Sequence, residues 1–257
     1  MLFNINDYVT RESYNNDVLF QIVSIEKNVA KLVGVNIRLC ADSDINDLKK
    51  VEKVISDDSE LLNRFESNLD RSEYFYLPGK ILHIDSDNDY LKRCMNFYKK
   101  INVKAYGQII KEKNIGNRIL DLIDEYNPDI LVITGHDAYY KKKGKEDDNN
   151  NYENTLNFVN AVRAVRRKFS HNELIIVAGA CQSNYEELIK SGANFASSPK
   201  RINIHALDPA IIAGSLALSS KNKPIDLLNI LSKTKYGKDG MGGIITNGTM
   251  YVGYPRW

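Results

Sequence analysis

The sequence predicts an α/β protein in which a mostly parallel sheet flanked by helices follows a small β domain. Three observations predict this arrangement. Strand-like and helix-like segments alternate from Leu77 onward, which is typical of parallel strands joined by right-handed helical crossovers. Two of those strand segments are continuously apolar, as strands covered on both faces must be. Residues 1–48, by contrast, contain only short β-branched segments with turns between them.

The N-terminal part reads as a β domain because its apolar segments are short and rich in Val and Ile. Asn-Asn-Asp and Lys-Asn turns separate these segments and leave little room for a helix. We predict a small SH3-like barrel over residues 1–48 and a charged linker or helix over 49–76. An α/β domain then fills residues 77–257. The expected N-terminal strands are 7–13, 17–27, 29–35 and 37–43.

The α/β part shows five strand segments with helices between them. In the tail we expect two helices, near 208–220 and 224–233, and then a hairpin running from 242–248 into 249–255. The expected strands are 79–86, 103–110, 128–137, 173–181 and 193–198, and the expected helices between them are 87–101, 115–127, 155–169 and 184–192.

Composition and charge exclude several classes of protein. Of the 257 residues, 43% are apolar and 26% are charged, and the net charge is +2, so we expect no dedicated nucleic-acid or membrane surface. The three cysteines, Cys40, Cys94 and Cys181, are odd in number and widely scattered. This spacing argues against a disulfide framework and for a reducing compartment. With no secretory signal and no apolar run of about 18 residues, we expect a cytoplasmic protein.

Two apolar strands end in chemically reactive side chains. The third strand of the α/β part leads into His136 and Asp137, and the fourth leads into Cys181, 45 residues after His136. Reactive groups collect at the carboxyl ends of parallel strands, so we expect an imidazole and a thiol on one edge of the sheet. A following helix N-terminus and a nearby imidazole would stabilise a thiolate there. Outward-pointing N–H groups would bind a developing oxyanion, and together these parts form a cysteine-protease dyad.

Each residue also has an ordinary structural interpretation. A lone buried cysteine is more often a small hydrophobic residue than a catalyst, and a lone histidine at a strand end is mostly a satisfied loop residue. Cys40 and Cys94 are interpreted this way, whereas His83, which also ends a strand, is a secondary candidate for the same edge. No histidine has metal-ligand spacing with a cysteine, so we expect no zinc.

Long stretches of the chain resemble the YabG family of sporulation-specific proteases. They are "DYVTRESYNNDVLFQIVSIE", "PGKILHIDSD", "DILVITGHDAYYKKKG" and "IIVAGACQSNYEELIKSGANFASSPKRINIHALDP". More remotely, a histidine strand followed by an Ala-Cys strand is similar to caspases and clostripain. That resemblance implies a caspase-like fold with Cys181 as nucleophile and His136 as general acid. The caspase class has glycine directly after the histidine, where this chain has Asp137.

The resemblance also implies a substrate class and a cellular place. It implies cleavage of spore coat and other spore proteins after basic residues, chiefly arginine, in the sporulating cell at the forming coat, with no cofactor. The backbone N–H groups of Asp137 and Cys181 are the candidate oxyanion donors. An arginine pocket needs a carboxylate that can accept the planar guanidinium, and Asp137 and Asp208 are the candidates.

Other interpretations stay open. The protein could be a non-catalytic scaffold for coat assembly that binds through the N-terminal barrel. It could also be a receiver-like signalling domain, although Thr134 to His136 stand where a phosphorylated aspartate would be needed. The polar run 141–151 is interpreted as a solvated loop, or alternatively as a self-cleavage or gating loop because it offers basic residues.

Overall fold

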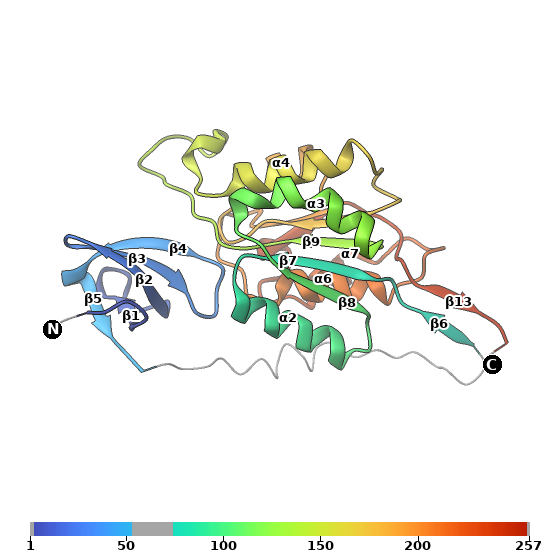
Figure 1. Cartoon of the computed structure of the whole chain (residues 1–257), viewed down its shortest axis with the longest axis horizontal. Coiled ribbons are helices and arrows are strands. Elements are labelled where there is room, and N and C mark those ends of the chain that lie inside the picture. The colour runs from blue at the N-terminus through green and yellow to red at the C-terminus, as the bar shows by residue number, and fades with distance from the viewer. Residues whose placement is uncertain (1–2, 53–73, 256–257) are drawn as a thin grey trace.

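The N-terminal unit is a five-stranded antiparallel sheet. The computed structural model describes residues 3–52 and 74–255, and this sheet has the order β4-β3-β2-β1-β5 (Figure 1). The predicted β domain is therefore confirmed as an antiparallel sheet, while its closure into an SH3-like barrel stays a prediction. Its strands are β1 (Tyr8–Arg11), β2 (Phe20–Glu26), β3 (Val29–Gly34), β4 (Cys40–Asp44) and β5 (Leu48–Lys50).

The segment that joins the two units is only partly described. Strand β5 ends at Lys50, and the next element is β6 (Phe75–Leu77). Most of the linker or helix predicted over 49–76 lies outside the described residues.

The second unit is built on a six-stranded sheet with the order β12-β11-β10-β9-β7-β8. The five strands from β7 to β11 are parallel to their neighbours, and β12 is antiparallel. The mostly parallel sheet is thus confirmed, and β9 and β10, which lead to His136 and Cys181, are direct neighbours. The strands are β7 (Ile81–Asp85), β8 (Ala105–Ile109), β9 (Ile130–Ile133), β10 (Ile175–Ala178), β11 (Phe195–Ser197) and β12 (Met241–Gly243).

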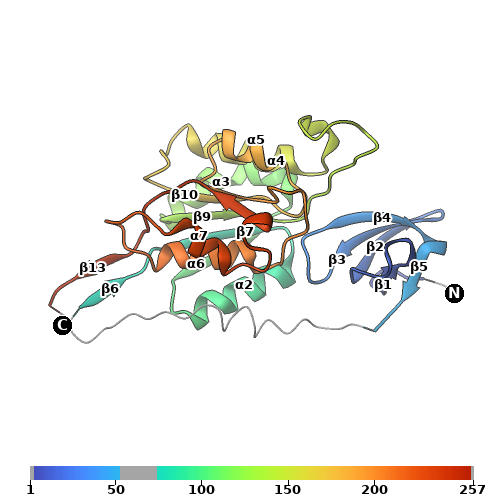
Figure 2. The same cartoon turned by 180° about the vertical axis from the view of Figure 1, so that it is seen from behind.

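Helices cover both faces of this sheet (Figures 1 and 2). Successive strand residues point to opposite faces, and the core therefore divides into two clusters. Val132 packs on the side of α2 (Asn88–Lys100), α6 (Asp208–Ala217) and α7 (Leu227–Ser232). Leu131 packs on the side of α3 (Glu112–Tyr126), α4 (Thr155–Arg166) and α5 (Tyr185–Lys190). Within the described part of the chain, no helix is long and apolar enough to cross a bilayer.

The hairpin predicted over 242–255 is wrong. Strand β12 pairs with β11, whereas β13 (Tyr251–Gly253) pairs with β6 in a separate two-stranded sheet that projects from the α/β unit in Figure 1. Between β12 and β13 the chain hydrogen-bonds to the segment that follows α6. The Gly248 N–H donates to the Ser220 carbonyl there at 3.1 Å. The two strands therefore find different partners, which the local turn residues could not reveal.

The order of the strands creates a crevice between β7 and β9. From β7 the chain passes through α2 to the edge strand β8, and α3 then returns it to β9 on the other side of β7. Helices α2 and α3 consequently lie on opposite faces. In open α/β sheets, such a reversal leaves room for a ligand outside the carboxyl ends of the two strands. We therefore expect the functional site at the ends of β7, β9 and β10.

Helix α6 is buried along its whole length, which makes its packing a test of the core. We expect Ile211→Ala to lower the free energy of unfolding by about 2–5 kcal/mol, because it deletes buried methylene groups and leaves a cavity. The measurement is urea denaturation followed by circular dichroism. Leu228→Ala is the control, because Leu228 on α7 is 69% exposed and its loss should cost within about 0.5 kcal/mol. Equal losses for both variants would contradict this description of the core.

Candidate active site

His136 is held in a fixed orientation just after β9. Its N–H donates to Glu112 Oε1 at 3.0 Å, and its Nε2 lies 3.2 Å from Asp87 Oδ2. The Tyr90 ring packs against the imidazole with 5.2 Å between ring centroids. The side chain is only 8% exposed, yet Nδ1 has no hydrogen-bond partner among the described residues. One nitrogen of this buried imidazole is anchored by a carboxylate and the other is unpaired. This arrangement is typical of a general acid or base, because the unpaired nitrogen can exchange a proton with a reacting group.

Cys181 follows β10 after a sharp turn. Gly179 makes this turn at φ +105°, where an added Cβ would lie 2.4 Å from Ser197 Oγ. The sulfur is fully buried and accepts a hydrogen bond from the Ile204 N–H at 3.2 Å. Burial is the main cause that raises the pKa of the Cys181 thiol well above its ordinary value. The sulfur thus bonds to the Ile204 backbone, whereas the sequence predicts that the N-terminus of the next helix stabilises a thiolate.

Asp137 joins the two loops that carry His136 and Cys181. Its carboxylate accepts from the backbone of Ala138 and Asn154, from Thr155 Oγ1, and from Ser183 Oγ at 2.7 Å. Ser183 lies two residues after Cys181, so this carboxylate ties the β9 loop to the β10 loop. Burial raises the pKa of Asp137 to about 6, although these hydrogen bonds oppose the shift.

Asp208 holds a different part of the rim together. Its carboxylate accepts from the His205 N–H at 2.8 Å and from the Lys235 N–H at 2.9 Å, and the side chain is fully buried. Burial raises the pKa of Asp208 to about 6. Asp137 and Asp208 are the two carboxylates that the sequence predicts as arginine acceptors. Both are occupied by hydrogen bonds from neighbouring backbone and side-chain groups.

A segment of the N-terminal unit crosses the rim between the two candidate catalytic loops. It runs from the turn after β3 into β4, and in Figure 2 it lies where the N-terminal sheet meets the α/β unit. On one side, Ile37 forms an antiparallel bridge with His205; on the other, Leu39 forms a parallel bridge with Asp137. The Arg38 carbonyl between them accepts from the Cys181 N–H at 3.0 Å.

The backbone of this segment is bound as an added strand. The Arg38 N–H donates to the Ile204 carbonyl, and the Cys40 N–H donates to the Asp137 carbonyl, both at 3.4 Å. In a parallel bridge, the residue facing Leu39 bonds to both of its neighbours. The Asp137 N–H consequently faces the Arg38 carbonyl.

The side chain of Arg38 fills the crevice between β7 and β9. Its Nη1 lies 2.5 Å from Asp85 Oδ2, and its Nη2 donates to the Ala206 carbonyl at 2.6 Å. Both charged side chains are fully buried. Burial opposes each charge, but mutual attraction dominates, so the pKa of Arg38 is raised and that of Asp85 is lowered. The Tyr90 ring, 5.0 Å from the guanidinium carbon, and Cys94 Sγ, 3.6 Å from Nη2, complete the pocket.

His83 stands behind this pocket rather than on the rim. The side chain is fully buried, with Nδ1 2.9 Å from the Tyr98 hydroxyl and Nε2 3.1 Å from Thr134 Oγ1. Thr134 in turn donates to Asp85 Oδ2 at 2.8 Å. Burial lowers the pKa of His83, which keeps it neutral. Its role is to hold Thr134 and through it Asp85.

A cavity of about 770 Å³ opens on the far side of Leu39. It lies between the N-terminal sheet and the loop after β9, and its lining includes Cys40, Ala138, Tyr139, Tyr140 and Gln182. A bound peptide that extended beyond the position of Leu39 would enter this cavity. Among the described residues, no group of three or more histidine, cysteine, aspartate or glutamate side chains could hold a metal ion.

The fold and the site together define an α/β protein that holds an extended, arginine-bearing segment of its own chain against the loops that follow β9 and β10, at the carboxyl edge of its sheet. A family model described as YabG peptidase U57 matches residues 4–255. The chain is also 43% identical over 286 aligned residues to the sporulation-specific protease YabG of Bacillus subtilis (strain 168), with 99% of each chain covered. The chain belongs to the YabG peptidase U57 family, and it is a protease, as the sequence resemblance implied.

Sequence reasoning missed the residues that form the pocket. Asp85 was visible as an acid directly after an apolar strand, at the place where the strand order reverses. Asp87 and Tyr90 follow on the next turn, so a search of that strand end for carboxylates could have found the pocket. No local signal marks Arg38, because its place depends on how the N-terminal sheet docks.

The buried carboxyl of Asp208 makes stability depend on pH. Its pKa rises from an ordinary 3.8 to about 6 on folding, so between these values the folded protein holds a proton that the unfolded chain has released. The contribution of Asp208 to the free energy of unfolding should therefore fall as pH rises from about 4 to 6, on the order of 2 kcal/mol.

Urea denaturation of the Cys181→Ala chain at pH 4, 5 and 6.5 measures this slope, free of thiol chemistry. Asp208→Asn should reduce the slope whatever it does to the absolute stability, and Asp137, whose pKa burial also raises to about 6, contributes to the rest of the slope. Asp121→Asn, at an exposed position on α3, should leave the slope as it is. If the Asp208→Asn variant showed the same slope as its parent, the raised pKa of Asp208 would be contradicted.

Proposed function

We propose that the protein is a cysteine endopeptidase of sporulation that cleaves after basic residues, chiefly arginine. Cys181 is the nucleophile and His136 the general acid and base. Its substrates are spore coat and other spore proteins, and it acts in the sporulating cell at the forming coat. The curated relative's name supports the setting, and the bound segment 37–40 supports the chemistry.

The observation that carries the proposal is the binding of Arg38. Its carbonyl oxygen accepts from the Cys181 N–H while its guanidinium pairs with Asp85. A protease must hold the carbonyl of the scissile bond on N–H donors beside its nucleophile. Because one residue satisfies both requirements, this geometry supports Asp85 as the carboxylate of the specificity pocket. The proposed arginine acceptor is therefore Asp85 in place of Asp137 and Asp208, whose carboxylates are occupied by internal hydrogen bonds.

The surrounding residues supply the other parts of the reaction. The Cys181 N–H, which bonds to the Arg38 carbonyl, and the Asp137 N–H, which faces it, would stabilise the oxyanion of a tetrahedral intermediate. His136, oriented by Asp87 through Nε2, would take the thiol proton and pass it to the leaving amine. The Asp137 carboxylate is a positioning group, since it fixes the two loops relative to each other.

The chain as described is in a closed state. The sulfur is fully buried, burial raises the pKa of its thiol, and the Cys181 N–H is occupied by the Arg38 carbonyl. Displacement of segment 37–40 would free this N–H for the carbonyl of another substrate. We therefore expect catalysis of external substrates to require displacement of this segment.

The nucleophile assignment predicts a sharp difference among the three cysteines. Cys181→Ala should keep the fold but abolish cleavage of arginine peptides, whereas Cys40→Ala should retain it and Cys94→Ala, which removes one contact of the arginine pocket, should still cleave. His136→Ala should lower kcat/KM by about 10²-fold or more, the range of general acid–base catalysis. The measurement is incubation with a spore-coat extract, with sequencing of the new N-termini and circular dichroism as the folding control. An active Cys181→Ala protein would refute the mechanism.

The pocket assignment predicts a loss of charge recognition. Asp85→Asn should lower kcat/KM for a peptide with arginine before the scissile bond by roughly 10²-fold, because a buried charge pair loses one partner. A matched peptide with citrulline, which has nearly the shape of arginine without its charge, should change little. The ratio of the two rates is the readout, because partial misfolding lowers both equally. An unchanged ratio would place arginine recognition elsewhere.

A further inference from the structure

We propose that the protein's own Arg38–Leu39 peptide bond is its first substrate, cut in cis by Cys181. This inference rests on the proposed function. It names a regulatory substrate, a bond between β3 and β4 of the N-terminal sheet, and therefore assigns that sheet a role in controlling the site.

The backbone around this bond is bound as a substrate would be. An extended peptide that adds to an exposed strand is held by main-chain hydrogen bonds, with side chains in pockets giving specificity. Here the residues on both sides of the bond are held, Arg38 by Ile204 and Leu39 through its bridge with Asp137. The carbonyl carbon that would be attacked thus lies between the Cys181 loop and the His136 loop.

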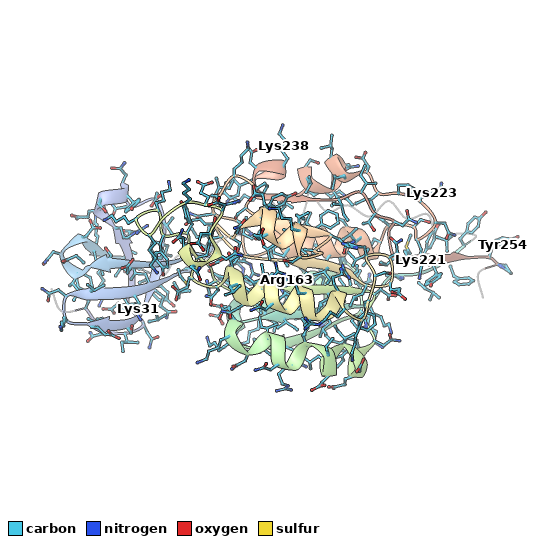
Figure 3. The ribbon with its side chains drawn as sticks, turned by 90° about the horizontal axis from the view of Figure 1, so that it is seen from above. Lys31, Arg163, Lys221, Lys223, Lys238 and Tyr254 are labelled. Atoms are coloured by element: carbon cyan, nitrogen blue, oxygen red, sulfur yellow. The ribbon has the colours of Figure 1, made fainter. Side chains whose placement is uncertain are left out.

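The arginine side chain points to the same conclusion. Basic side chains of the N-terminal sheet can stay in solvent, as Lys31 does on its surface (Figure 3). Arg38 instead enters the core of the other unit with none of its side chain exposed. A buried ion pair adds little stability compared with apolar packing of similar volume, so stability alone gives no reason for an arginine here. An arginine at this position is explained if the segment is itself a substrate. A bond that the enzyme cuts must carry the side chain that its specificity pocket binds.

A further observation comes from the unused imidazole nitrogen. His136 Nδ1 is buried and, within the described part of the chain, has no hydrogen-bond partner. An unsatisfied buried nitrogen costs free energy. The cost is explained if Nδ1 serves the proton transfers between the thiol and the leaving Leu39 nitrogen.

The reaction follows the ordinary course of a thiol protease. The Cys181 sulfur attacks the Arg38 carbonyl carbon as His136 accepts the thiol proton. The bond from Arg38 carbon to Leu39 nitrogen then breaks, and His136 returns the proton to that nitrogen. The resulting thioester is hydrolysed by water, which leaves a carboxylate on Arg38, a free amino group on Leu39 and a restored thiol.

The cut chain would stay together at first. The bond lies between β3 and β4, which pair with each other over five residue pairs from Val29 to Val33. Strand β1 likewise pairs with β5 across the cut. Fragment 1–38 would therefore remain docked by strand pairing, but Arg38 could now leave its pocket without breaking the chain.

The test is intact-mass analysis of the purified full chain. We expect the wild type to yield fragments 1–38 and 39–257 at a rate independent of protein concentration, and Cys181→Ala to remain a single chain. Arg38→Gln should block this cut, whereas Arg11→Gln, in the same sheet, should not. Cys181→Ala mixed with wild type should stay uncut, because its Arg38 is sealed in its own pocket. Native gel filtration should elute the two wild-type fragments together.

An arginine peptide assayed in parallel separates the two proposals. If Cys181-dependent peptide cleavage occurs but the 38–39 bond stays intact, self-cleavage is overturned and the protease function stands. If neither peptide nor chain is cut, the proposed function itself fails. Should the Cys181→Ala chain be cut at Arg38 by wild type in trans, cleavage in cis would be refuted, and circular dichroism of each variant excludes loss of fold as the cause.

Discussion

The buried pair of Arg38 and Asp85 is the interaction on which the arrangement of the molecule depends. It places a charge from the N-terminal sheet at the point where the strand order of the α/β sheet reverses. Two buried charges are tolerated only when they are paired and further hydrogen-bonded. Thr134 and the Asp87 N–H bond to the carboxylate, and the Ala206 carbonyl bonds to the guanidinium. The two units of the chain are therefore joined by one buried and fully hydrogen-bonded arginine–aspartate pair.

This dependence explains why the rim could be predicted from the sequence and the pocket could not. Apolar strands that end in His136 and Cys181 carry their own signal, since the carboxyl ends of neighbouring parallel strands must meet. The sequence offers Asp137 and Asp208 as arginine acceptors because they are close in sequence to the candidate catalytic residues. Proximity in sequence does not identify the carboxylate that Arg38 meets in the structure, which is Asp85. Asp85 is 96 residues from Cys181 by number, and only the order β10-β9-β7 brings their strand ends together.

The same limit applies to the elements of the tail and of the N-terminal unit. The alternation of strands and helices predicts a parallel sheet because each crossover is local. The expected hairpin over 242–255 fails because β12 and β13 pair with β11 and β6, which lie far away in the chain. Residues 37–43 have the pattern of a single strand, yet only Cys40–Asp44 joins the N-terminal sheet. The residues before Cys40 are extended for a different reason, which is the hydrogen bonding they receive from the rim of the other unit.

A covalently attached segment in an active site excludes external substrates by concentration alone. A tethered peptide competes at an effective concentration of about millimolar or above, and here Tyr90 also fixes its turn by donating to the Ile37 carbonyl at 2.6 Å. Few substrates reach such a level, so occupancy by Arg38 would hold the enzyme inactive as long as the chain is intact. Cutting the 38–39 bond converts the segment into a product bound by strand pairing, which a competing strand can displace. On the proposed mechanism the protease would need no separate inhibitor, because the reaction that it performs on other substrates would also release its own segment from the site.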